Sequence, residues 1–162
     1  MANRRSFQFG CFALLLCLNS SSLSANEDRH AGYYYPKLNS QEVYTARAAT
    51  LANASRKRRI VFVTELVNQM MSNPYPPPFA IYAKGSEAEK MIITGLYDNA
   101  YNTLYRMRGL LALLSARARG TPIFHEYQVE DLFTYLDLLK LLGFKQLTVT
   151  DGDQFAHQIN IE

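Results

Sequence analysis

The feature that most constrains the fold is a strand, a tight turn and a second strand at the C-terminal end of the sequence. Two runs of alternating character, 146–150 and 154–161, flank Asp151-Gly152-Asp153. An aspartate followed by glycine readily adopts the backbone conformations of a tight hairpin turn. The pattern predicts an antiparallel hairpin, which any fold of this chain must accommodate.

Upstream of this hairpin, helical and strand patterns follow one another through the chain. Apolar residues at helical spacing predict helices over 57–71, 100–118 and 129–142, and shorter apolar runs predict strands over 41–46, 79–84 and 90–97. The proline-rich stretch 74–78 must end the first helix, because proline lacks an amide donor. Strands joined by short turns predict an α+β fold: a mainly antiparallel sheet with about three helices packed on one face and a C-terminal β-hairpin.

The first 25 residues have the order of a secretory signal peptide. Arg4 and Arg5 precede an apolar run from Phe9 to Leu18, and small residues lead to Ala25. The apolar run is shorter than the roughly 20 residues that a membrane-spanning helix needs. We therefore expect cleavage near Ala25 and a periplasmic or secreted protein, exported by the general secretory or the twin-arginine route.

Cleavage at this point changes what the composition implies. Both cysteines, Cys11 and Cys17, lie in the segment, so the mature chain cannot use thiol chemistry, thiolate metal sites or disulfides. The 17 basic and 14 acidic residues of the whole chain include Arg4 and Arg5, so the mature charge nearly balances, which argues against a nucleic-acid partner. We expect a tyrosine-rich extended entry segment over 26–40, a single domain over 41–162 and no integral membrane span in the mature chain.

Tyrosines and arginines are the candidate binding residues. Tyr33, Tyr34 and Tyr35 precede a proline, where aromatic side chains suit contact with a peptide or sugar. Arg56 and Arg58 belong to the densest basic run, and four more arginines lie in the segment 106–119. Arg106 and Arg117, eleven residues apart, share a helical face with leucines between them. Such a face suits an anionic amphiphile, although packing against an acidic part of the protein would explain it equally well.

The two histidines of the predicted domain, His125 and His157, are the candidates for chemistry. His157 alternates with the apolar residues of its strand, which favours a hydrogen-bonded core histidine over a functional one. If it is functional, a carboxylate such as Asp151, Asp153 or Glu126 would orient its ring. The alternative function is accordingly a small hydrolase or transferase that uses His157 or His125 with nearby carboxylates as acid and base. The histidine spacing matches no metal-site motif, and no cofactor is predicted.

Several longer segments resemble a family of small exported proteins from alphaproteobacteria. They are HAGYYYP (30–36), PYPPPFAIYAKG (74–85), AEKMII (88–93), TLYRMRGLLALL (103–114) and the segment from LGF to TVTDGDQFAHQI (142–159). Some members of that family carry the label molybdopterin-guanine dinucleotide biosynthesis protein A. The glycine-rich nucleotide loop of that enzyme class has no counterpart in this sequence, so this function is the disfavoured alternative.

The sequence thus predicts an exported binding or accessory domain without catalytic activity. Its expected partner is an envelope protein or an anionic ligand, contacted through tyrosines and arginines. The residue pattern indicates neither a monomer nor an oligomer.

Overall fold

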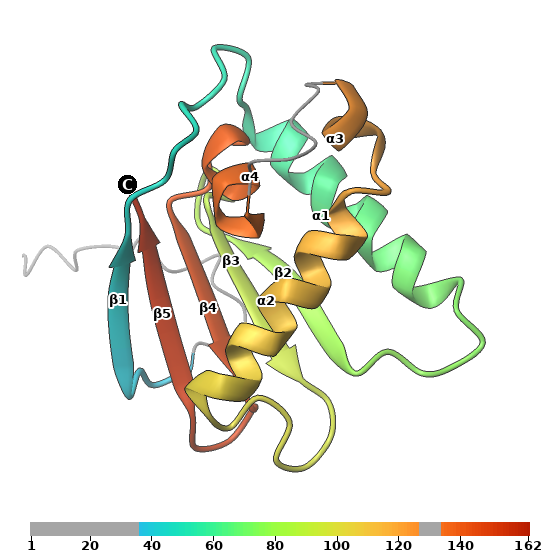
Figure 1. Ribbon diagram of the computed structural model, residues 1–162, viewed down its shortest axis with the longest axis vertical. Helices are drawn as coiled ribbons and strands as arrows, with labels where there is room; N and C mark the ends of the chain where they lie inside the picture. The colour runs from blue at the N-terminus through green and yellow to red at the C-terminus, as the bar shows by residue number, and fades with distance from the viewer. Residues whose placement is uncertain (1–35, 127–133) are drawn as a thin grey trace, which may run out of the picture.

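We describe a computed structural model of the chain over residues 36–126 and 134–162. These residues form a five-stranded sheet and four helices (Figure 1). In chain order they are β1 (Ser40–Tyr44), α1 (Arg56–Met71), β2 (Phe79–Lys84), β3 (Lys90–Gly95), α2 (Leu104–Ala118), α3 (Pro122–Glu126), α4 (Tyr135–Leu141), β4 (Gln146–Thr150) and β5 (Ala156–Ile161). The predicted α+β class and the C-terminal hairpin are confirmed.

The strand order of the sheet is β1-β5-β4-β3-β2. The two hairpins, β2–β3 and β4–β5, pair antiparallel, whereas β3–β4 and β1–β5 pair parallel. The sheet is therefore mixed where we expected it to be mainly antiparallel. The reason is that helices α2 to α4 return the chain across the sheet between β3 and β4, and such a crossover sets the two strands parallel.

The hydrophobic core lies between the helices and one face of the sheet. Alternate positions of the strands point to this face, as the period of two in a β-strand requires. They form one apolar cluster with residues of α1, α2 and α4. Its largest fully buried side chains include Phe62, Phe79, Met91, Met107, Leu139 and Phe144. The helices accordingly cover one face of the sheet, as expected.

Local capping explains where the helices begin. Ser55 caps α1, as its position before the apolar periodicity suggests, and the Ser55 hydroxyl accepts a hydrogen bond from the Arg58 amide. Helix α2 begins at Leu104 after the cap Thr103, several residues later than predicted. The delay has a backbone cause, since Asn99 and Tyr101 have φ values of 60° and 56°, which no right-handed helix contains.

Two other parts of the chain differ from the prediction in detail. The short helix α3 was not expected, and β5 begins at Ala156 because Asp151 to Phe155 form the turn. The start predicted for the last helix, residues 129–133, lies outside the described residues, as do Tyr33, Tyr34 and Tyr35. Within 36–126 and 134–162, no helix has the length and apolar character needed to cross a bilayer.

Candidate functional site: the groove between α2 and α4

A groove of about 510 Å³ runs between α2 and α4 and reaches the end of β1. Its apolar wall consists of Leu111, Ala112 and Ala116 from α2 together with Leu136 from α4. The rest of the lining consists of Tyr44, Ser115, Thr134 and Tyr135, together with Arg108 and Arg119. The volume lies within the range of about 300–1,000 Å³ that is usual for small-molecule sites.

The two arginines, Arg108 and Arg119, lie on the same side of α2. Both side chains are exposed, and within the described part of the chain neither makes a hydrogen bond or an ion pair. They are eleven residues apart, which corresponds to about 16 Å along a helix axis. The groove therefore carries, along an apolar wall, two positive charges that no carboxylate of residues 36–126 and 134–162 neutralises.

The helix geometry explains why these arginines, and not Arg106 and Arg117, border the groove. With about 100° of rotation per residue, Arg108 and Arg119 lie on one flank of the buried Met107, and the other pair lies on the opposite flank. On that opposite flank, Arg117 lies over the ring of Phe79, with its guanidinium carbon 5.9 Å from the ring centroid. The predicted pattern of arginines with leucines between them exists, but it borders another hollow: Arg106 lines a cavity of about 400 Å³ with Leu110 and Leu113, whereas Arg108 and Arg119 line the α2–α4 groove.

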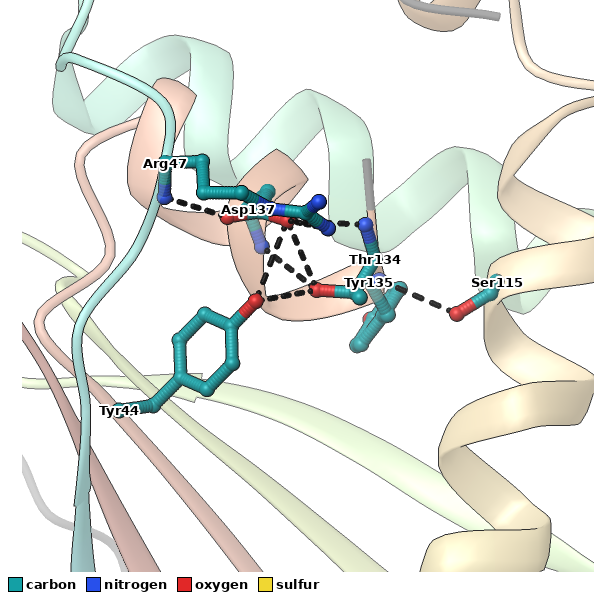
Figure 2. A network of polar contacts seen from close by, with 6 residues as sticks. All are labelled: Tyr44, Arg47, Ser115, Thr134, Tyr135 and Asp137. Atoms are coloured by element: carbon teal, nitrogen blue, oxygen red, sulfur yellow. Dashed lines mark hydrogen bonds and ion pairs between the residues drawn. The ribbon is translucent and has the colours of Figure 1, made fainter. Parts of the chain in front are cut away.

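A buried carboxylate, Asp137, organises the polar end of the groove (Figure 2). It accepts hydrogen bonds from the Arg47 amide at 2.7 Å, the Thr134 amide at 3.0 Å and the Tyr44 hydroxyl at 3.2 Å. The Thr134 hydroxyl in turn accepts from the Asp137 amide, so the two residues form a capping box at the start of α4. Asp137 thus holds the loop after β1 against the first turn of α4.

Burial alone would raise the pKa of Asp137, because it disfavours the charged form. The hydrogen bonds from the amides of Thr134 and Arg47 outweigh this effect, with further contributions from the hydroxyls of Thr134 and Tyr44, and the pKa lies below its ordinary value. The Arg47 guanidinium is 3.3 Å away but its side chain is 61% exposed, so solvent screens this ion pair. Hydrogen bonding therefore keeps the carboxylate ionised.

Ser115 joins the two helices that form the groove. Its hydroxyl donates to the Leu111 carbonyl at 2.8 Å. The same hydroxyl accepts from the Tyr135 amide at 3.0 Å (Figure 2). The Tyr135 amide is one of the first-turn donors of α4 that no helical carbonyl can satisfy. The ring of Tyr135 is fully buried, and this burial raises the pKa of its hydroxyl, which contacts the Met91 sulfur at 3.2 Å. The walls of the groove are consequently fixed before any ligand binds.

The structure distributes the predicted site residues over several places. Arg58 forms an ion pair with Glu126 at 2.9 Å and so joins α1 to α3. Arg106 donates to the Asn99 carbonyl and the Asn102 side chain at the start of α2. Arg56 borders a small cavity beside the turn between β2 and β3. These three arginines therefore do not share a site with one another or with the groove.

His157 is buried between the sheet and the helices, on the apolar face that the alternation predicts. Its Nδ1 lies 2.7 Å from the Ser40 hydroxyl, and its Nε2 lies 3.4 Å from Glu42 without hydrogen-bond geometry. The neighbouring carboxylate is thus Glu42 rather than Asp151, Asp153 or Glu126. None of the cavities described here is lined by His157.

His125 is exposed on α3, where its ring makes an edge-on contact with Phe124 at 6.3 Å between centroids. Among the described residues, no group of three or more His, Cys, Asp or Glu side chains is placed to hold a metal ion. The acid–base chemistry proposed for the histidines therefore stays a prediction, and neither histidine lines the α2–α4 groove.

The sequence held unused indications of the groove residues. Arg108 and Arg119 have the same spacing as the predicted pair, Arg106 and Arg117. Only the packing of α2 distinguishes the two pairs. Thr134 and Asp137 match the threonine-x-x-acid pattern of a capping box, which marks a helix start. Comparison of the chain with protein-family models, curated proteins and solved structures gave no match.

Proposed function

We propose that the mature chain is an exported binding domain without catalytic activity, and that its α2–α4 groove binds an anionic amphiphile of the fatty-acid type. The observation that carries this proposal is the pairing of Arg108 and Arg119 with an apolar wall, with no carboxylate of the described chain neutralising either arginine. A carboxylate head group bound by one guanidinium would leave its alkyl chain beside Leu111 and Leu136.

Charge and shape both support this choice of ligand. Arginine binds carboxylates through a planar fork of donors, and it loses less hydration than lysine when it does so. The apolar side chains of the wall favour an alkyl chain by removing its surface from water. A neutral apolar ligand would form no ion pair with the arginines. A small inorganic anion would bury none of the apolar wall.

The hydroxyl groups at the polar end support the same orientation. The hydroxyls of Tyr44 and Thr134 contact each other at 2.9 Å and both contact Asp137. The carboxylate of Asp137 repels a second carboxylate, so we expect the ligand head group at an arginine and away from this network. The network's contribution is to hold α4 in place relative to β1.

The test is a titration of the mature protein with laurate below its micelle-forming concentration, followed by amide NMR shifts. We expect saturable shifts along α2 and α4. The double variant Arg108→Gln and Arg119→Gln should weaken binding at least tenfold, and each single variant shows which arginine binds the head group. Lys57→Gln, which removes one positive charge from α1, is the matched control and should bind as the native protein does.

A ligand with the opposite charge makes the test decisive. Dodecyltrimethylammonium has a similar alkyl chain with a cationic head, and we expect it to bind weakly or not at all in the groove. Equal binding of both amphiphiles, or full laurate affinity in the double arginine variant, contradicts the proposal. The export part has its own test, since mass spectrometry of protein from its native cells should find a chain that begins close to residue 26.

A further inference from the structure

A second cavity, of about 940 Å³, lies at the end of the sheet where strand β3 ends. One wall is the loop 96–103 between β3 and α2, and the other is the turn 151–155 between β4 and β5. Figure 1 shows both connections at the same end of the sheet. Strands β3 and β4 are parallel neighbours, so this cleft lies beyond their carboxyl ends, where parallel sheets commonly bind ligands.

Internal hydrogen bonds fix both walls of this cleft. On one wall, an oxygen of Asp151 accepts from the amides of Asp153, Gln154 and Phe155 at 2.9–3.0 Å. Gly152 in this turn has a φ of 91°, which favours glycine. On the other wall, the Asn102 amide group donates to the Asn99 side chain at 3.0 Å. The cleft therefore exists before a ligand enters it.

The charge of the cleft is negative. Asp98 lies on the first wall and Asp153 on the second, and within 36–126 and 134–162 neither carboxylate makes a hydrogen bond or an ion pair. The described lining contains no lysine, arginine or histidine, and beside it Arg106 donates to the Asn99 carbonyl and the Asn102 side chain. Two carboxylates on facing walls of a cleft concentrate cations there.

The remaining lining identifies the kind of cation. Thr94 also lines the cleft, but its hydroxyl oxygen is shielded from solvent and makes no hydrogen bond within the described residues. Tyr97 and Phe155 add aromatic side chains, which attract organic cations and bury alkyl groups. As the described residues gather no set of metal ligands, an organic cation fits this lining better than a metal ion does.

From these observations we infer that the cleft binds a small aliphatic diamine, with one ammonium group at Asp98 and the other at Asp153. The diamine's methylene groups lie against Tyr97 and Phe155. This site is separate from the α2–α4 groove and has the opposite charge. A result that contradicts one of the two proposals therefore leaves the other unaffected.

The experiment is a calorimetric and NMR titration of the mature protein with putrescine at low ionic strength. We expect saturable binding with amide shifts in 94–103 and 150–156. 1,4-Butanediol, which has the same length but no charge, should bind at least tenfold more weakly. Asp98→Asn and Asp153→Asn should each weaken putrescine at least fivefold, whereas Glu87→Gln at the opposite end of β3 should have no effect.

Three outcomes overturn the inference. Equal binding of butanediol would show that charge has no part in recognition, and non-saturable shifts would show general attraction to a negative surface. Unchanged putrescine affinity in both aspartate variants would place the ligand elsewhere. Circular dichroism of each variant checks its folding, and retained laurate binding by the folded variants confirms that the groove is unaffected.

Discussion

Aspartates lie beside the α2–α4 groove and in the cleft beyond β3 and β4, but the structure uses these aspartates differently. Asp137 beside the groove is fully buried, and amides and hydroxyls surround its carboxylate. Asp98 and Asp153 in the cleft are exposed, and their carboxylates make no hydrogen bond or ion pair within the described residues. The difference separates a carboxylate that holds the fold together from carboxylates that remain available to a ligand.

The largest expected effect is that of Asp137→Asn. An asparagine amide has two donors where the native oxygen accepts from Thr134 and Tyr44, so a donor would face another donor. We expect a loss of about 3 kcal/mol in the free energy of unfolding, measured by urea denaturation. A loss below about 1 kcal/mol would contradict the structural role of this carboxylate.

The pH dependence of the same variant provides its control. Because the pKa of Asp137 is lowered in the folded protein, its contribution is fully present above the unfolded value of about 4 and is lost as the pH falls toward the folded value. The difference in stability between the native protein and Asp137→Asn should therefore narrow below about pH 4. A constant difference between pH 3 and pH 6 would show that the charge of Asp137 is not responsible.

Asp151 shares a feature with each kind of aspartate. It lines the cleft, but its carboxylate already accepts hydrogen bonds from amides of the turn. Asp151→Ala leaves the amides of Asp153, Gln154 and Phe155 to solvent and loosens the hairpin. We expect a loss of about 2 kcal/mol in the free energy of unfolding, measured by thermal denaturation. Faster hydrogen exchange at these amides distinguishes a loosened turn from a general loss of stability.

The sequence predicted those parts of the fold that depend on local chemistry. The hairpin around Asp151-Gly152 and the strand Phe79–Lys84 follow from neighbouring residues, and the structure has them as expected. The late start of α2 was not predictable in this way, since residue periodicity does not reveal the positive φ of Asn99 and Tyr101. The parallel pairing of β1 with β5 joins residues more than a hundred positions apart, and no local pattern encodes it.

The sequence did not single out the arginines that line the α2–α4 groove. Arginines spaced along a leucine-rich helix led to the prediction of a basic and apolar face with Arg106 and Arg117, whereas Arg108 and Arg119 line the groove. Which of the two flanks borders this groove depends on where Met107, Leu110 and Leu114 pack, and this is a property of the assembled core. Sequence reasoning also missed the cleft, because its walls come from loops at the ends of two strands that only the sheet brings together.

The smallest expected effect is that of replacing both free carboxylates, Asp98→Asn with Asp153→Asn, on the stability of the protein without ligand. Exposed side chains without partners change stability by no more than about 0.5 kcal/mol. Removing two like charges from facing walls should, if anything, stabilise the protein slightly at low salt, and this gain should disappear at high salt. Thermal unfolding at two salt concentrations measures it. A loss above about 1 kcal/mol would instead show that these carboxylates hold the loops together, as Asp137 holds α4, and the contrast between the two regions would fail.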